Sequence, residues 1–248
     1  MKVPREWHKD FFKNSFYNPA SPAAVAKAPM ETAFVLKQLR LKKGAKLLDL
    51  CCGPARHAIL LAERGLAVTG YDFSTDYLKE AAAKARKAKV KLTLLRGDMR
   101  QLKFKEEFDA VINLFTSFGY FRRFSEDIKT LRGISRALKP GGLFMIDIIH
   151  GDHVRKNFRA RNWTRLEDGS HHLEEAVLTK DGVLNTWTVI KKNKVQKRSF
   201  FSRLYSRSRM SAAMKQAGLT PLKFWGSFSG TPLTHKTNRL IVLARKTK

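Results

Sequence analysis

The chain has 248 residues, and its 49 Lys and Arg against 21 Asp and Glu give a formal net charge of +28. That length suffices for one large domain with an embellishment, and no apolar run approaches the ~20 residues that a membrane-spanning helix needs. The amino terminus lacks the apolar segment of a secretory signal, and the only cysteines, Cys51 and Cys52, are adjacent and poorly placed for a disulfide or a zinc site. We therefore expect a cytoplasmic protein with no membrane partner.

The positive charge is spread along the chain. Residues 151–209 carry fourteen Lys and Arg against six Asp and Glu, a net of +8, which leaves +20 for the other 189 residues. Such a balance attracts polyanions, so a nucleic-acid partner is one interpretation. Solvated surface lysines are the other.

Residues 1–45 are expected to form a helical lead-in. Packing is the expected role of an aromatic stripe at near-helical spacing, formed by Trp7, Phe11, Phe12, Phe16 and Tyr17. The prolines at positions 19, 22 and 29 predict a loop. An amphipathic helix is then predicted over residues 30–39.

Residues 46–50 and 67–72 predict two buried strands, joined by a tight turn and a helix that opens at about Arg56. In such a unit the turn aims backbone N–H groups at a ligand, and an acidic residue after the second strand, here Asp72, binds ribose hydroxyls. The G-x-G-x-x-G turn of a pyrophosphate site is absent, since Gly53 is the only one of its three glycines. The pattern therefore predicts a nucleoside-containing cofactor other than a dinucleotide.

The alternation of helix and strand continues through the next eighty residues. Ser74 is a good N-cap for a helix over residues 75–89, with Asp76 in its first turn and basic residues near its end. A third strand is predicted at 92–95 and a fourth at 109–115. A helix over 125–138 is stopped by Pro140, and a fifth strand follows up to residue 147.

From about residue 152 the pattern changes to β-branched and aromatic runs. Three or four antiparallel strands are predicted within 162–165, 172–179, 183–191 and 195–204, with a hairpin signal at Asp181-Gly182. A helix over 208–217, closed by Gly218, and two strands at 219–227 and 239–244 complete the core. Because the insertion leaves from the carboxyl ends of the strands, where ligands bind, we predict that residues 152–207 form a lid.

The turn after the first strand resembles motif I of the class I S-adenosylmethionine-dependent methyltransferases, whose usual form is Asp-Leu-Gly-Cys-Gly-Thr-Gly. Four residues match it: Asp49, Leu50, Cys52 and Gly53. Cys51 and Ala55 stand where glycines are usual, and Pro54 stands where threonine is. The resemblance continues in order through motif II at Asp72, the adenine-reading pair of Asp98 and Met99, and the fourth and fifth strands, so it covers essentially the whole chain.

This resemblance implies an α/β fold: a Rossmann-like seven-stranded methyltransferase sheet with helices on both faces and an inserted antiparallel β subdomain. Residues 46–151 and 208–248 would then bind S-adenosylmethionine. The implied cofactor-binding residues are Asp49, Cys51, Gly53, Arg56, Asp72, Phe73, Asp98, Met99, Asn113 and Leu114.

Individual roles follow from the family pattern. Asp72 would bind both ribose hydroxyls, while Asp98 and the Met99 backbone would read adenine. Asp49 either orients the turn or approaches the methionine amine through water. Arg56 either meets the methionine carboxylate or has a structural role.

Methyl transfer needs the acceptor, the methyl group and the sulfur in line, and it needs a base only if the acceptor must lose a proton. The candidate catalytic residues are His150, Tyr120, Tyr205 and Arg203, each with a packing or connecting role as the alternative. Phe115, Phe118 and Tyr120 could line an aromatic wall or pack in the core. The spacing of Asp147, His150, Asp152 and His153 does not require a metal.

A small-molecule acceptor is the preferred interpretation, because the inserted sheet resembles a pocket cover. The absence of an Asn/Asp-Pro-Pro-Tyr type of motif argues against methylation of nucleic-acid bases. The alternative is an RNA methyltransferase or a nucleic-acid-binding protein with a degenerate cofactor site, and a nicotinamide oxidoreductase comes third. A monomer and a homodimer both remain open.

Overall fold

The computed structural model describes residues 3–4, 6–12, 16–17, 19–166, 169–192 and 194–247. Its centre is a seven-stranded sheet in the order β10-β11-β5-β4-β1-β2-β3, in which β11 is antiparallel to its neighbours and the strands from β5 to β3 are parallel. The strands are β1 (Lys46–Leu50), β2 (Ala67–Asp72), β3 (Thr93–Arg96), β4 (Phe108–Asn113), β5 (Leu138–Ile149), β10 (Leu219–Trp225) and β11 (Arg239–Lys246). The predicted α/β fold is confirmed.

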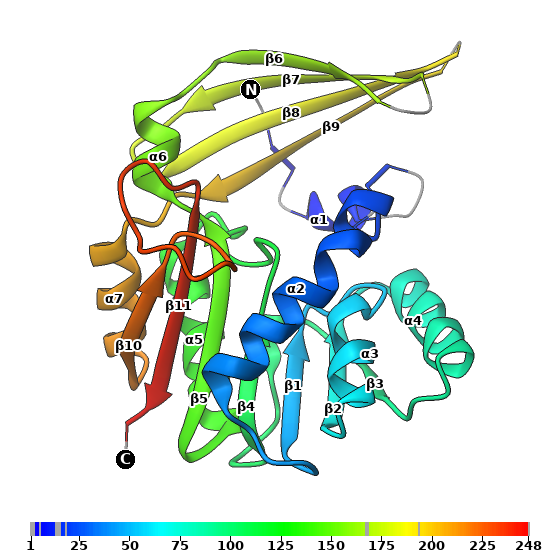
Figure 1. The fold of residues 1–248 in the computed structure, drawn as a ribbon. Helices are drawn as coiled ribbons and strands as arrows, with labels where there is room; N and C mark the ends of the chain where they lie inside the picture. The colour runs from blue at the N-terminus through cyan, green and yellow to red at the C-terminus, as the bar shows by residue number, and fades with distance from the viewer. Residues whose placement is uncertain are drawn as a thin grey trace.

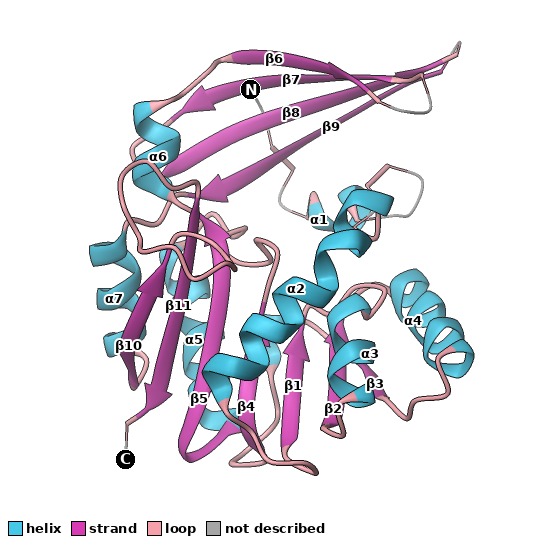
Figure 2. Cartoon of the chain, in the orientation of Figure 1, coloured by secondary structure: helices cyan, strands magenta, loops and turns pink. Residues whose placement is uncertain are grey.

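Helices cover both faces of this sheet (Figures 1 and 2). The longer ones are α2 (Pro22–Leu39), α3 (Arg56–Glu63), α4 (Thr75–Lys87), α5 (Phe124–Ala137) and α7 (Arg207–Gln216). Successive residues of β1 point to opposite faces, so Leu48 packs in the core that contains α5 and α7, whereas Leu47 packs in the core that contains α2 and α3. Apolar strands covered on both faces are typical of parallel sheets.

The amino-terminal part of the fold differs from the expectation. Helix α2 begins at Pro22 rather than at residue 30, because Ser21 caps it by accepting the Ala24 N–H and proline is favourable in the first helical turn. Pro29 lies inside the helix. The aromatic stripe forms only a short helix, α1 (His8–Phe11). Two further short helices, η1 (Met99–Gln101) and α6 (Gly151–Lys156), were not predicted.

The predicted insertion is a four-stranded antiparallel sheet in the order β6-β7-β8-β9. Its strands are β6 (Arg161–Arg165), β7 (His171–Leu178), β8 (Gly182–Lys191) and β9 (Lys194–Arg203). Figure 1 shows this second sheet above the carboxyl ends of the parallel strands, with α1 between the two. Phe200 of β9 and Trp187 of β8 both contact Phe11 of α1, so the inserted sheet supports the amino-terminal segment.

Candidate functional site

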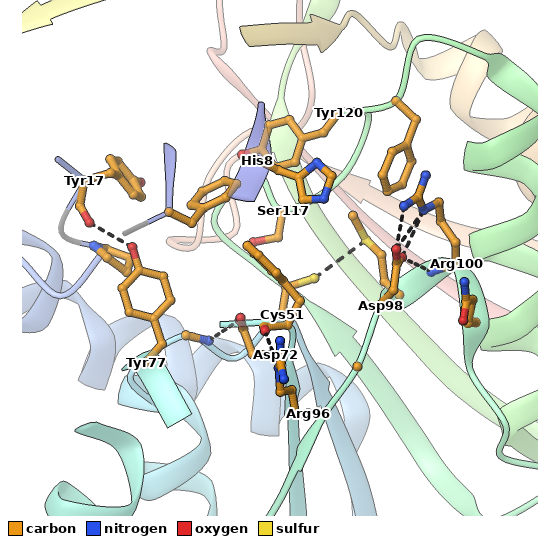
Figure 3. Close-up of a pocket in the computed structure, with 18 of the residues that line it drawn as sticks. His8, Tyr17, Cys51, Asp72, Tyr77, Arg96, Asp98, Arg100, Ser117 and Tyr120 are labelled. Atoms are coloured by element: carbon orange, nitrogen blue, oxygen red, sulfur yellow. Dashed lines mark hydrogen bonds and ion pairs between the residues drawn. The ribbon is translucent and has the colours of Figure 1, made fainter. Parts of the chain in front are cut away.

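A cavity of about 530 Å³ lies at the carboxyl ends of β1, β2 and β4. The sheet side supplies predicted cofactor residues, among them Cys51, Gly53, Asp72, Phe73, Asp98 and Met99. The opposite wall comes from the amino-terminal segment, with His8, Phe12, Tyr17 and Pro19. Figure 3 shows Asp72 and Cys51 on the floor of this cavity and His8 and Tyr120 on the other side.

The turn after β1 has an unusual backbone. Cys51 and Ala55 both adopt the left-handed conformation, with φ of 61° and 63°, and Gly53 has a φ of 54°. A residue with a side chain is destabilised there by roughly 1–2 kcal/mol, which explains why small residues occupy the two positions. A Cβ on Gly53 would lie 3.6 Å from the Pro19 ring, an ordinary van der Waals contact, so the left-handed backbone rather than a lack of room favours glycine there.

Asp72 links this turn to β2. One carboxylate oxygen accepts the Gly53 N–H at 2.9 Å, and the other accepts the Ser74 N–H at 2.9 Å. Each oxygen retains capacity for a further donor, since a carboxylate offers about four acceptor sites. Burial raises the pKa of Asp72, although the backbone donors oppose the shift.

Asp98 is paired within the protein. Its carboxylate accepts hydrogen bonds from the Arg100 side chain, the shortest at 2.6 Å, and Arg100 also pairs with Glu126 at 2.7 Å. Burial alone would raise the pKa of Asp98, but the hydrogen bonds from Arg100 lower it below its ordinary value. The Arg100 guanidinium lies 4.4 Å above the Phe121 ring. If Asp98 contacts adenine, its carboxylate therefore binds Arg100 at the same time. Arg100 was not predicted as a partner of Asp98 from the sequence.

A smaller cavity of about 40 Å³ adjoins the same turn and is lined by Asp49, Arg56 and Leu114, among others. Asp49 Oδ2 and Arg56 Nε are both buried, and neither has a hydrogen-bond partner among the described residues. Burial raises the pKa of Asp49 to about 7, while Arg56 lowers it and Asp72 raises it further. These two atoms belong to side chains of opposite charge that line the cavity, so they fit a ligand with an amine and a carboxylate.

Arg56 has a structural role as well. Its guanidinium donates to the Pro19 carbonyl at 2.7 Å, contacts Glu31 at 3.4 Å and lies 4.2 Å above the Phe115 ring. Glu31 also contacts His57 Nε2 at 2.7 Å, and burial lowers the pKa of His57. Two roles were predicted for Arg56, a structural one and contact with the methionine carboxylate. These contacts show the structural role, and Nε is free of a hydrogen bond from the described residues and available for the carboxylate.

The corner after β4 is held from the sheet. Phe115 and Thr116 have φ of 60° and 59°, which is strained for residues with side chains. The Asp147 carboxylate accepts the Phe115 N–H at 2.9 Å, and Arg239 pairs with Asp147 and donates to Thr116 Oγ1 at 3.1 Å. Phe115 is 37% exposed and lines both cavities, so this buried ion pair positions an aromatic wall of the site.

Three of the four candidate catalytic residues lie outside the lining of both cavities. His150 is 3% exposed and bonds the Thr237 carbonyl at 3.1 Å. Arg203 and Tyr205 share the buried carboxylate of Asp127, at 2.8 and 2.7 Å. Both residues fasten the end of the inserted sheet to α5, which is the connecting role that the sequence left open beside a catalytic one.

Tyr120 is the catalytic candidate that lines the larger cavity. Burial raises its pKa, so its phenol stays protonated and can donate a hydrogen bond but cannot act as a base near neutral pH. Its ring packs edge-on against Trp7 at 5.3 Å, which joins the cavity wall to the amino-terminal segment.

Asn113 is the one predicted cofactor residue that lines neither cavity. It is fully buried, and its side chain donates to the Leu50 carbonyl at 2.9 Å, which holds the end of β1 against β4. Its Nδ2 thus joins two strands, while its Oδ1 has no hydrogen-bond partner among the described residues.

The sequence analysis missed the cavity residues of the amino-terminal segment, chiefly His8, Phe12 and Tyr17. Their signal was the aromatic stripe, which was interpreted as packing alone. That packing is real, since Trp7 and Phe11 are 5% and 4% exposed. No described residue of 152–207 lines either cavity, so the insertion reaches the site through this segment.

Comparison with known proteins agrees with this site. Residues 47–142 match the family model of a methyltransferase domain. The chain is 36% identical over 113 residues to the demethylmenaquinone methyltransferase of Staphylococcus carnosus (strain TM300), which covers 44% of this chain and 45% of that protein. The chain thus spans about half the length of the curated relatives it matches.

Solved structures share the fold over most of the chain. An S-adenosylmethionine-dependent methyltransferase from Clostridium acetobutylicum ATCC 824 has a TM-score of 0.77 at 20% identity, covering 89% of this chain and 92% of that one. The CcbJ methyltransferase from Streptomyces caelestis has a TM-score of 0.80 at 19% identity, covering 94% and 100%. The chain therefore has the fold of these solved methyltransferases, and its residues 47–142 match a methyltransferase domain.

Proposed function

We propose that this chain transfers a methyl group from S-adenosylmethionine to a small-molecule acceptor in the cytoplasm. The observation that carries the proposal is the pairing of Asp72 with the Gly53 turn at the floor of the cavity, beside the unpartnered Asp49 and Arg56 atoms. Carboxylates that face a tight turn at the ends of β1 and β2 suit a ligand with ribose hydroxyls and an amino acid moiety.

The residues present fit this cofactor. Asp72 can accept from ribose hydroxyls, and Asp98 with the Met99 backbone can contact the adenine. Asp49 can face the ammonium group, and Arg56 Nε can face the carboxylate. S-adenosylmethionine supplies a methyl group that its sulfonium has already activated, so the protein mainly has to orient the acceptor and exclude water.

Aromatic residues suit the reacting end of the site. Phe115, Phe12 and Tyr120 line the cavity together, and aromatic faces stabilise a cation such as a sulfonium. The amino-terminal segment closes this side, and Tyr77 holds it by donating to the Tyr17 carbonyl at 2.8 Å. A closed, dry wall is what in-line transfer requires.

A small acceptor is supported by the size of the cavity. Its volume of about 530 Å³ falls within the range of roughly 300–1,000 Å³ that is typical of small-molecule sites. The curated relative from Staphylococcus carnosus is named for demethylmenaquinone, a small molecule. The nucleic-acid alternative rests on the net charge alone.

The test is transfer of labelled methyl from S-adenosylmethionine in two parallel reactions, one with a fractionated small-molecule extract and the other with total RNA and DNA. Label in a small-molecule fraction supports the proposal. Label in nucleic acid alone assigns the chain to the alternative. A Tyr120→Phe protein serves as a matched variant, because the change removes the phenol donor and leaves the aromatic packing against Trp7.

A further inference from the structure

The far end of the inserted sheet exposes apolar side chains. Trp163 of β6 and Val195 of β9 are each 67% exposed, and Leu166, directly after β6, is 43% exposed. Figure 1 shows this end of β8 and β9 projecting away from the seven-stranded sheet. Large apolar groups gathered at a projecting end are a feature of interaction surfaces.

The strand register places Trp163 and Val195 on one face of the inserted sheet. Arg165, His171, Ile190 and Val195 lie in one cross-strand row, and the next row on that face contains Trp163, Leu173, Thr188 and Lys197. The opposite face carries Trp187 and Phe200, which pack on α1. We call the projecting end the sheet tip; it comprises Trp163, Arg165, Leu166, Ile190, Lys191, Lys192, Lys194 and Val195.

The sheet tip is basic as well as apolar. Residues 186–198 contain five Lys and Arg and no Asp or Glu, whereas residues 161–171 contain two of each, so the two segments together have a net charge of +5. The side chains of Lys191, Lys192 and Lys194 are exposed around the β8–β9 hairpin, next to Val195. Arg165 is likewise exposed beside Leu166. The β8–β9 hairpin thus carries exposed cations on both faces: Lys197 shares the face of Trp163 and Val195, and Lys191 and Lys194 lie on the other face.

We propose that the sheet tip docks the protein on an anionic membrane surface. Lysines attract anionic headgroups, while a tryptophan and short aliphatic side chains suit the interface between headgroups and acyl chains. This contact is peripheral. Among the described residues no helix is both long and apolar enough to cross a bilayer. The proposal departs from the expectation of no membrane partner, which was based on the lack of a spanning segment.

Two other occupants fit less well. A second copy docked tip to tip would bring Lys191, Lys192 and Lys194 against their own counterparts, because a two-fold contact is self-complementary, and like charges would repel. A nucleic acid would match the lysines but would place phosphates and sugars on Val195 and Leu166, and only Trp163 could stack on a base. An anionic bilayer matches both the charge and the apolar centre.

The test is cosedimentation with unilamellar vesicles, either of phosphatidylcholine alone or of equal parts phosphatidylcholine and phosphatidylglycerol, at physiological salt. The wild-type protein should sediment with the anionic vesicles and not with the neutral ones. Replacing Lys191, Lys192 and Lys194 together by Gln should weaken binding on the order of a hundredfold. Trp163→Ser should weaken it by about tenfold. All of these side chains are exposed, so circular dichroism should be unchanged.

A matched control removes the same charge elsewhere. Lys42, Lys43 and Lys105 are exposed at the amino ends of β1 and β4, away from the sheet tip. Their triple Gln variant should keep vesicle binding. Equal losses in both triple variants, or a wild-type protein that leaves anionic vesicles unbound, would overturn the proposal. So would a wild-type protein that binds RNA through the sheet tip and ignores vesicles.

Discussion

The Asp72 carboxylate accepts the backbone N–H of Gly53 at 2.9 Å, which joins the end of β2 to the turn that follows β1. The two groups are nineteen residues apart in the sequence. This contact fixes the backbone of the turn and leaves the remaining acceptor sites of the carboxylate facing the cavity. The Asp72 side chain therefore both fixes the backbone of the turn and provides hydrogen-bond acceptors for the cofactor.

Asp72→Ala should weaken the affinity for S-adenosylhomocysteine by one to three orders of magnitude, since each charge-assisted hydrogen bond to ribose is worth about 1.5–3 kcal/mol. Asp72→Asn keeps one acceptor oxygen and should lose less. Calorimetry measures both. Asp76→Ala, an exposed carboxylate in the first turn of α4, is the control and should bind normally. An unchanged dissociation constant for Asp72→Ala would remove Asp72 from the site.

Asp49 should make cofactor affinity depend on pH. Burial raises the pKa of its carboxyl to about 7, so a large share of the protein carries a neutral Asp49 below that pH. The ammonium group of the cofactor favours the ionised carboxylate, and affinity should therefore rise as the pH increases from about 6 to about 8. Calorimetry in buffers with different ionisation enthalpies should detect proton release on binding.

The raised pKa of Asp49 also predicts how the free energy of unfolding depends on pH. Its folded pKa of about 7 lies above the value of 3.8 for an unperturbed carboxyl. Its stabilising contribution is therefore fully present below pH 3.8 and is lost as the pH rises through about 7. Asp49→Asn should abolish both the stability trend and the pH dependence of affinity. If Asp49→Asn keeps the full pH dependence of stability and affinity, another group is responsible for it.

The buried group of Asp127, Arg203 and Tyr205 should govern stability rather than catalysis. Asp127→Ala leaves the Arg203 guanidinium buried without its carboxylate, which costs about 3–5 kcal/mol of unfolding free energy. Tyr205→Phe removes one hydrogen bond to a charged group and should cost about 1.5–3 kcal/mol. Urea denaturation measures both changes. If Tyr205→Phe keeps its stability but loses methyl transfer, the structural assignment is wrong.

Support of the amino-terminal segment by the inserted sheet can be tested at two adjacent positions. Phe200 points to α1 and contacts Trp7 and Phe11 at centroid distances of 5.5 and 4.7 Å. Phe201 is equally buried but points to the opposite face. Phe200→Ala should speed cofactor release in stopped-flow measurements, because it loosens the wall of the cavity. Phe201→Ala should lose similar stability, about 3–5 kcal/mol, without that effect. Equal rates of cofactor release from Phe200→Ala and Phe201→Ala would argue against support of the amino-terminal segment by the inserted sheet.

The sequence predicted the parts of the fold that follow from local pattern. The apolar runs of β1, β2 and β4, the Ser74 cap and the hairpin signal at Asp181-Gly182 each specify their own element, and the structure contains all of them. The residues of the Gly53 turn and Asp72 were found for the same reason, since one βαβ unit brings them together.

What the sequence did not show depends on contacts between distant segments. Glu126 pairs with Arg100 from 26 residues away, and Asp127 binds Arg203 from 76 residues away. The packing of His8 against Phe73 likewise joins the first helix to the end of β2. No periodicity encodes such pairs, so the sequence left both a catalytic and a connecting role open for Arg203 and Tyr205, and His8 was not predicted.

The central claim is that the cavity binds S-adenosylmethionine, and isothermal titration with S-adenosylmethionine and S-adenosylhomocysteine tests it most directly. Both should bind with micromolar dissociation constants, around −8 kcal/mol, and NAD should not bind. A folded protein that binds neither compound, or that binds NAD instead, would contradict the account.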